Sequence, residues 1–269
     1  MPAPTPLSPL AVRHLPASGG APASGGAPAN SAAPATAAAP APTGLPPVLL
    51  LHGFASSSAA DFGDWADALA AAGREAYLVD LPGHGDSPAV PGADAGRTSA
   101  VVTAVADVIR SIGADRVDVI GYSLGARLAW ELPAATGRVR RLVLGGLSPF
   151  EPFAGVDVVA VARAVDGEPP ADPFAGMMAG MVSGAGRDTD SLLALIAGLG
   201  SEPFAPEGPA TSRPDVPTLF AAGSDDPMTQ GLDGLTAVIP DARLVRVPGD
   251  HLGALHSPEF REAALTFLA

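Results

Sequence analysis

The sequence contains no cysteine. Disulfides, thiolate metal sites and a cysteine nucleophile are therefore excluded, and cysteine usage says nothing about the redox compartment. Basic residues are also scarce, with 15 Lys and Arg against 28 Asp and Glu and a formal net charge of −13. Because no basic cluster counters this charge locally, the chain repels polyanions, and we expect no nucleic-acid partner.

Long apolar runs are absent as well, since no stretch reaches the roughly 18 continuous apolar residues that a membrane helix needs. Residues 1–45 are rich in Ala, Pro, Gly and Ser and poor in large apolar side chains, which predicts a disordered tail. Prolines interrupt this segment and no basic cluster precedes an apolar run in it, so we expect no secretory signal and a cytoplasmic protein. The oligomeric state stays open.

Residues 46–269 alternate short apolar runs with helical patterns. The runs at residues 47–51, 75–81, 117–120, 141–145, 218–222 and 243–247 predict strands. Segments between them, such as 61–72 and 98–112, carry apolar residues at helical spacing and are followed by glycine. This alternation predicts an α/β domain with a mostly parallel sheet flanked by helices.

One section breaks the alternation. Residues 149–215 hold no clear strand pattern but contain short apolar helical patterns separated by Pro and Gly. Since long structureless insertions are uncommon in compact domains, we expect a helical lid over a site rather than a loop region. Its larger apolar side chains suggest a pocket for an apolar acyl or alcohol group: Phe150, Phe153, Phe174, Met177, Met178, Met181, Leu192 and Leu195.

Ser123 lies in the pentapeptide Gly-Tyr-Ser-Leu-Gly, between a predicted strand and a predicted helix. A sharp strand-to-helix turn would leave no room for a Cβ atom at Gly121 or Gly125. Such a turn would expose the serine at the carboxyl edge of the sheet, beside amides of a helix N-terminus. These features predict a nucleophile, although the pentapeptide alone is equally compatible with a small residue at an ordinary turn.

A serine nucleophile needs a base and a carboxylate that orients the base. Of the five histidines, His251 lies in a Pro-Gly loop directly after a predicted strand, at the same edge of the sheet. Asp225 and Asp226 follow the preceding predicted strand. We favour Asp226, because Pro227 restricts the backbone after it and adjacent loop residues tend to point opposite ways. Asp225 is then expected to cap a turn or helix.

The order Ser, acid, His, each in a loop after a strand, resembles the serine-nucleophile branch of the α/β-hydrolase fold superfamily. Two further segments carry the resemblance, LLLHGF at residues 49–54 and DLPGHGDS at residues 80–87. The match covers residues 46–269 apart from the variable lid. It implies an α/β-hydrolase fold, a Ser-His-Asp triad, and no metal or organic cofactor.

The resemblance also assigns roles to residues around the triad. The backbone N–H groups of Phe54 and Leu124 would form the oxyanion hole, and His52 and His84 would brace loops. One departure is Asp250, where the family commonly has glycine before the histidine. This extra carboxylate could raise the basicity of His251 or simply point to solvent.

A serine with an oxyanion hole suits acyl transfer on a small-molecule substrate, and we expect a carboxylesterase-like serine hydrolase that forms an acyl-enzyme. The segment GYSLGAR also resembles the elbow of a menaquinone-pathway lyase, SHCHC synthase. That resemblance implies that Tyr122 and Arg127 hold an anionic substrate while the triad acts as a base. Alternatively, Arg127 pairs with Glu131 one helical turn away. A third reading is a non-catalytic ligand-binding sensor.

Overall fold

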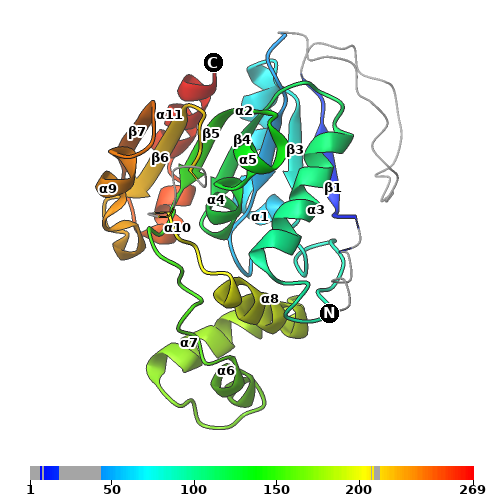
Figure 1. The fold of residues 1–269 in the computed structure, drawn as a ribbon, viewed down its shortest axis with the longest axis vertical. Helices are drawn as coiled ribbons and strands as arrows, with labels where there is room; N and C mark the ends of the chain where they lie inside the picture. Colours follow the sequence, from blue (N-terminus) through cyan, green and yellow to red (C-terminus); the bar gives the residue numbers. More distant parts are fainter. Residues whose placement is uncertain (1–6, 8, 18–43, 207, 209–212) are drawn as a thin grey trace.

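The computed structural model describes residues 7, 9–17, 44–206, 208 and 213–269, which form a sheet with helices on both faces (Figure 1). The strands are β1 (Val12–Leu15), β2 (Val48–Leu51), β3 (Ala76–Val79), β4 (Val117–Tyr122), β5 (Val139–Gly145), β6 (Thr218–Gly223) and β7 (Ala242–Val247). Their order across the sheet is β1-β3-β2-β4-β5-β6-β7. All neighbouring strands are parallel except β1, which runs antiparallel to β3.

The central strands are buried on both faces, which explains why they read as unbroken apolar runs. Successive side chains of a strand point to opposite faces, so β2 contributes to two separate cores. Leu49 and Leu51 pack with helices α3 (Thr98–Ser111), α4 (Leu124–Ala129) and α5 (Leu132–Thr136). Val48 and Leu50 pack on the other face, with α1 (Ser58–Phe62), α2 (Trp65–Ala71), α10 (His251–Leu255) and α11 (Pro258–Leu268).

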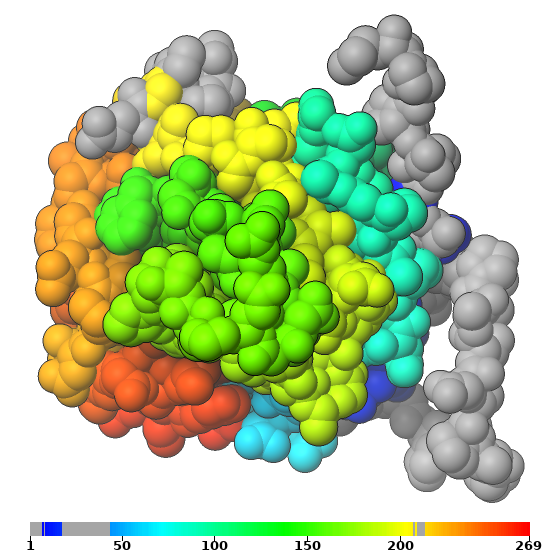
Figure 2. All heavy atoms as spheres, turned by 90° about the horizontal axis from the view of Figure 1, so that it is seen from below, coloured from blue at the N-terminus to red at the C-terminus, as the bar shows by residue number. Residues whose placement is uncertain are grey.

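The described residues between β5 and β6 form three helices, in the section where the sequence predicts a helical insertion. They are α6 (Val158–Val165), α7 (Pro173–Val182) and α8 (Thr189–Ser201), and they lie beyond the lower end of the sheet in Figure 1. Viewed from below, the segment containing α6 and α7, drawn in green, covers the centre of this face (Figure 2). We call α6–α8 the helical insertion; its action as a lid stays a prediction.

The apolar side chains of the helical insertion do not all face one pocket. Met178, Leu192 and Leu195 are buried in the core of the domain, because α7 and α8 need an apolar face to pack. Phe174 and Met177, on α7, are largely exposed. Phe150, in the loop after β5, is exposed as well, so the predicted set divides into core residues and exposed residues.

The predicted disordered tail needs a correction. Residues Val12–Leu15 form the edge strand β1, paired with β3 from Val12 opposite Val79 to Leu15 opposite Ala76. The ring of His14 stacks on Tyr77 at 4.5 Å between centroids, and its Nε2 atom lies 3.2 Å from a Glu75 carboxylate oxygen. These long-range contacts order a segment whose own composition is poor in apolar groups. Residues 1–6, 8 and 18–43 of the predicted tail lie outside the described residues.

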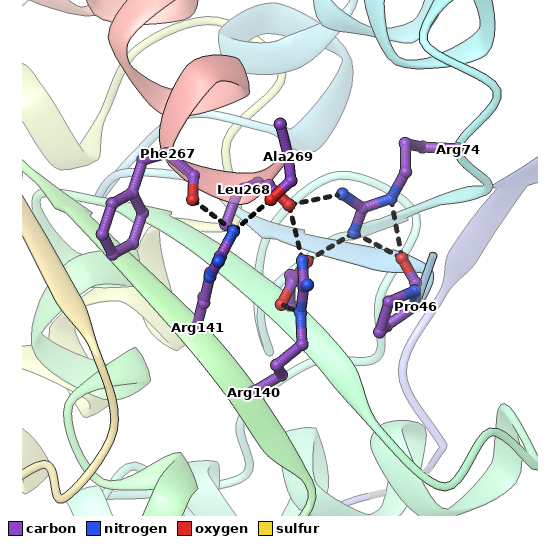
Figure 3. Close-up of polar contacts among 8 residues, drawn as sticks. Pro46, Arg74, Arg140, Arg141, Phe267, Leu268 and Ala269 are labelled. Atoms are coloured by element: carbon purple, nitrogen blue, oxygen red, sulfur yellow. Dashed lines mark hydrogen bonds and ion pairs between the residues drawn. The ribbon is translucent and has the colours of Figure 1, made fainter. Parts of the chain in front are cut away.

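At the opposite edge from the carboxyl ends of the strands, arginines bind the end of α11 (Figure 3). The Leu268 carbonyl accepts hydrogen bonds from Arg74 at 3.2 Å and from Arg140 at 2.5 Å. Both arginines also pair with Asp118, whose side chain is fully buried at the start of β4. Cations at a helix C-terminus complement its dipole, so this cluster anchors α11 against the sheet.

Among the described residues, no helix is long and apolar enough to cross a membrane.

Candidate active site

Ser123 occupies a strained turn between β4 and α4. Its φ of 51° and ψ of −113° lie in a region that residues with a Cβ atom seldom adopt. A Cβ atom at Gly121 would lie 2.4 Å from the Gly125 carbonyl oxygen, and one at Gly125 would lie 2.0 Å from the Leu51 carbonyl oxygen. Glycine is therefore required on both sides, and the turn has the geometry of a nucleophile elbow.

Three side chains from distant parts of the chain form a continuous series of hydrogen bonds. The Ser123 Oγ lies 2.9 Å from Nε2 of His251, and Nδ1 of the same imidazole lies 2.7 Å from Oδ2 of Asp226. The Asp226 side chain is fully buried, whereas about a quarter of the His251 side chain is exposed. The structure thus brings together the three residues that the sequence singled out, and we call them the Ser-His-Asp set.

Asp226, rather than its neighbour Asp225, reaches the histidine. Its second oxygen, Oδ1, accepts the backbone N–H of Met228 at 3.0 Å and caps the short helix η2 (Pro227–Thr229). Asp225 is exposed and points to the Ser224 hydroxyl at 3.3 Å. The capping role expected for Asp225 therefore belongs to Asp226. Because Oδ1 of Asp226 caps η2 while Oδ2 binds His251, the carboxylate is held in one orientation.

Asp250, the departure from the family pattern, is exposed to solvent. Its side chain accepts the Gly253 N–H at 2.8 Å and caps α10, the helix that His251 begins. A carboxylate at this position stabilises a helix start. Of the two roles considered for it, the solvent-facing one fits this placement.

The two predicted oxyanion donors belong to segments that lie next to Ser123. Leu124 is the first residue of α4, where backbone N–H groups have no acceptor within the helix. Phe54 follows Gly53, and a Cβ atom built on Gly53 would lie only 3.5 Å from Cβ of Ser123. The turn at Gly53 is held because its N–H donates to Asp61 Oδ2 at 2.8 Å. The role of these two amides in binding an oxyanion stays a prediction.

His52 and His84 brace these loops. The Nε2 atom of His52 accepts the Leu81 N–H at 2.9 Å, and that of His84 accepts the Ala55 N–H at 2.9 Å. Burial lowers the pKa of His52 to about 4 and that of His84 to about 3, so both rings are neutral at pH 7. Within the described residues, no group of three or more His, Asp or Glu side chains could hold a metal ion.

Tyr122 and Arg127, expected to hold an anionic substrate, are engaged by the protein itself. The Tyr122 hydroxyl donates to the His251 carbonyl, and the ring is only 2% exposed. Arg127 is 4% exposed, and its Nε donates to Oε2 of Glu151. The alternative partner, Glu131 at the next helical turn, is therefore wrong. The guanidinium instead pairs with Glu151, in the loop after β5.

Glu151 is the residue that sequence reasoning missed. Its carboxylate binds Arg127 and accepts the N–H groups of Phe153 and Phe204, each at 3.1 Å. Arg127 also donates to the Glu202 carbonyl at 2.8 Å, so both ends of the helical insertion are tied to α4. The pair is separated by 24 residues, and no spacing rule would have connected them.

Comparison with known proteins finds similar sequences and similar structures. A family described as alpha/beta hydrolase fold matches residues 46–165. The chain is 29% identical over 229 residues to 2-hydroxy-6-oxononadienedioate/2-hydroxy-6-oxononatrienedioate hydrolase 2 of Pseudomonas putida, covering 75% of this chain and 79% of that protein. It is 34% identical over 131 residues to the pimeloyl-[acyl-carrier protein] methyl ester esterase of Chromobacterium violaceum, covering 45% of this chain and 48% of that protein.

A solved structure has the same fold. The enol-lactonase from Burkholderia xenovorans LB400 superposes with a TM-score of 0.67 at 17% identity, and the match covers 96% of each chain. A likeness at this identity concerns the fold alone, because one fold hosts many reactions. The match to the family, the mostly parallel sheet and the elbow at Ser123 agree with one another. The chain has the α/β-hydrolase fold.

Proposed function

We propose that this protein is a serine hydrolase that cleaves a carboxylic ester, or a related acyl compound, through an acyl-enzyme. The observation that carries the proposal is the series of hydrogen bonds from Ser123 Oγ through His251 to Asp226, at 2.9 and 2.7 Å. An unassisted serine hydroxyl is a poor nucleophile near neutral pH, and a hydrogen-bonded imidazole supplies the missing base.

In the first half of the reaction, His251 accepts the hydroxyl proton while Ser123 Oγ attacks the carbonyl carbon. The carbonyl oxygen becomes an oxyanion, which the N–H groups of Phe54 and Leu124 stabilise. One such donor typically contributes about 3 kcal/mol. When the tetrahedral intermediate collapses, the protonated His251 gives its proton to the leaving alcohol, and the acyl group stays on Ser123.

In the second half, His251 takes a proton from a water molecule, and the resulting hydroxide attacks the acyl-enzyme. The acid is released and Ser123 recovers its proton from the histidine. Asp226 holds the imidazole in the tautomer that keeps Nε2 free to accept the serine proton, and it stabilises the imidazolium that forms. Its burial keeps water from competing for that hydrogen bond.

The surroundings of the Ser-His-Asp set favour an apolar acyl group. Phe150 in the loop after β5 is exposed, as are Phe174 and Met177 on α7 and Leu252, directly after His251. Exposed large apolar groups on the segments around a site commonly serve binding. We therefore expect esters of medium-chain acids to react faster than acetate esters.

The relatives support hydrolysis more than elimination. Their names describe a hydrolase of oxo-dienedioates and a methyl ester esterase. The lyase reading needs Arg127 for an anionic substrate, and the internal ion pair with Glu151 weighs against that use. The sensor reading has no observation that favours it, because the Ser-His-Asp set is complete.

The test is the hydrolysis of p-nitrophenyl esters with acyl chains of two to twelve carbons, with Ser123→Ala as the inactive control. We expect activity that peaks at medium chain length in the wild type and disappears in the alanine variant. Equal rates on acetate and medium-chain esters would contradict the apolar pocket. No ester activity from the folded protein would overturn the proposal and turn attention to the lyase.

A further inference from the structure

The Tyr122 hydroxyl links the two halves of the candidate active site. It donates a hydrogen bond of 2.5 Å to the backbone carbonyl of His251, 129 residues away in the sequence. Tyr122 is the last residue of β4 and immediately precedes Ser123, whereas His251 is the first residue of α10. One side chain therefore connects the strand that carries the serine to the helix that carries the histidine.

The Tyr122 ring has a closely fitted place. It packs against Phe260 at 5.6 Å and against the His251 ring at 5.5 Å between centroids. A Cβ atom at Gly145 would lie 2.6 Å from the tyrosine ring, and one at Gly146 would lie 2.8 Å from it and 3.0 Å from Cε1 of His251. The end of β5 thus approaches both rings so closely that the hydroxyl can reach few other positions.

The hydroxyl remains a donor over the whole working pH range. Burial is the main cause that raises the pKa of Tyr122, and the negative charges of Asp226, Asp61 and Asp250 raise it further. A backbone hydrogen bond from Leu255, in the last turn of α10, acts in the opposite direction but is weaker. The phenol of Tyr122 is therefore protonated at neutral pH.

We propose that Tyr122 is a positioning residue, which fixes the backbone of His251 so that Nε2 stays within hydrogen-bond distance of Ser123 Oγ. The inference rests on the proposed function, since it assigns a role in the same reaction. It replaces the anion-binding role that the lyase resemblance implies for this tyrosine. The hydroxyl donates its one hydrogen to the His251 carbonyl and therefore has none to donate to a substrate.

The anchor matters because it binds the backbone of His251 directly, at the first residue of α10. The helix spans only His251–Leu255, and Gly249 just before it has a φ of 106°. Asp226 binds the imidazole of His251, whereas the Tyr122 hydroxyl binds its backbone carbonyl. A displacement of about 1 Å between reacting groups can reduce a rate about 100-fold.

The test compares the two tyrosines of the chain, each converted to phenylalanine. Tyr122→Phe removes the anchor and keeps the ring. Tyr77→Phe removes a hydroxyl that is equally buried, 3.3 Å from Glu75, on a strand that does not carry the Ser-His-Asp set. We expect Tyr122→Phe to lower kcat about 10- to 100-fold with KM little changed, and Tyr77→Phe to leave both unchanged. The melting temperatures of the two variants should be similar.

A fluorophosphonate reagent separates failure of this inference from failure of the proposed function. The reagent forms a bond between Ser123 Oγ and phosphorus, fluoride leaves, and His251 takes the serine proton. If the wild type neither hydrolyses esters nor reacts at Ser123, the proposed function fails. If the wild type reacts and Tyr122→Phe reacts equally fast, only the positioning role is refuted. A loss of rate that merely follows a lower folded fraction would also overturn it.

Discussion

Replacing Arg127 by methionine removes the cation from a buried ion pair while keeping a side chain of similar length. The Glu151 side chain is 2% exposed, so its carboxylate would stay out of water with only the N–H groups of Phe153 and Phe204 as partners. Removing one partner of a buried pair typically destabilises a protein by about 3–5 kcal/mol. For a domain of this size, that corresponds to a melting temperature lower by roughly 10 °C.

The double variant Arg127→Met/Glu151→Met tests whether the loss comes from the unpaired charge. Buried pairs replaced by apolar residues of similar volume are often neutral in stability. We therefore expect the double variant to recover most of the free energy of unfolding, with a coupling energy of about 2–3 kcal/mol in the cycle. Urea titrations followed by circular dichroism measure all four proteins, and the slope m should stay constant.

The same variants separate an anchor from a substrate ligand. If Arg127 ties the ends of the helical insertion to α4, its loss should reduce turnover of neutral and anionic esters alike. If it bound an anionic substrate, stability would be nearly unchanged and only the anionic ester would lose affinity. A change in the free energy of unfolding below about 1 kcal/mol for Arg127→Met would refute the reasoning, since it would mean that Glu151 finds other partners.

Buried titratable groups also make stability and activity respond to pH and to single substitutions. Burial lowers the pKa of His52 to about 4 and of His84 to about 3, against 6.5 when unfolded, so the unfolded chain binds more protons below pH 6.5. The free energy of unfolding, measured by urea titration, should therefore fall between pH 6.5 and 4, by up to about 1.4 kcal/mol per pH unit for each histidine. Asp226→Asn should reduce kcat on a p-nitrophenyl ester about 10⁴-fold by stabilising the wrong tautomer, whereas Asp225→Asn should leave it nearly unchanged. Asp118→Asn should lower the free energy of unfolding by about 3–5 kcal/mol, because Arg74 and Arg140 lose the carboxylate that pairs with both of them.

Matched controls make these outcomes specific. His84→Gln should reduce the pH slope, because a carboxamide can make both hydrogen bonds of the imidazole without titrating. A free energy of unfolding that is flat between pH 7 and 5 would contradict neutral buried histidines. Similar kcat losses for both aspartate variants would refute the pairing of Asp226 with the histidine. Asp233→Asn, which breaks an exposed pair with Arg246, should change stability by less than about 1 kcal/mol.

Much of the fold could be predicted from the sequence, because apolar runs and helix-ending glycines are local patterns. The central strands are buried on both faces, so they read as continuous apolar runs, and the helices between them end at glycines such as Gly73 and Gly113, which adopt positive φ. The edge strand β1 escaped this reasoning. Its side chains are mostly exposed, and its order comes from pairing with β3, more than 60 residues away.

The sequence by itself determined which chemistry the site could support. A serine, an aspartate and a histidine each come directly after a strand, and the loops after parallel strands meet at one edge of the sheet. Only the tertiary structure decided which side chains serve the protein rather than a ligand. Arg127 binds Glu151 and Tyr122 binds the His251 carbonyl because packing brings together groups 24 and 129 residues apart. No local pattern encodes such pairings, since they depend on how whole layers of the fold meet.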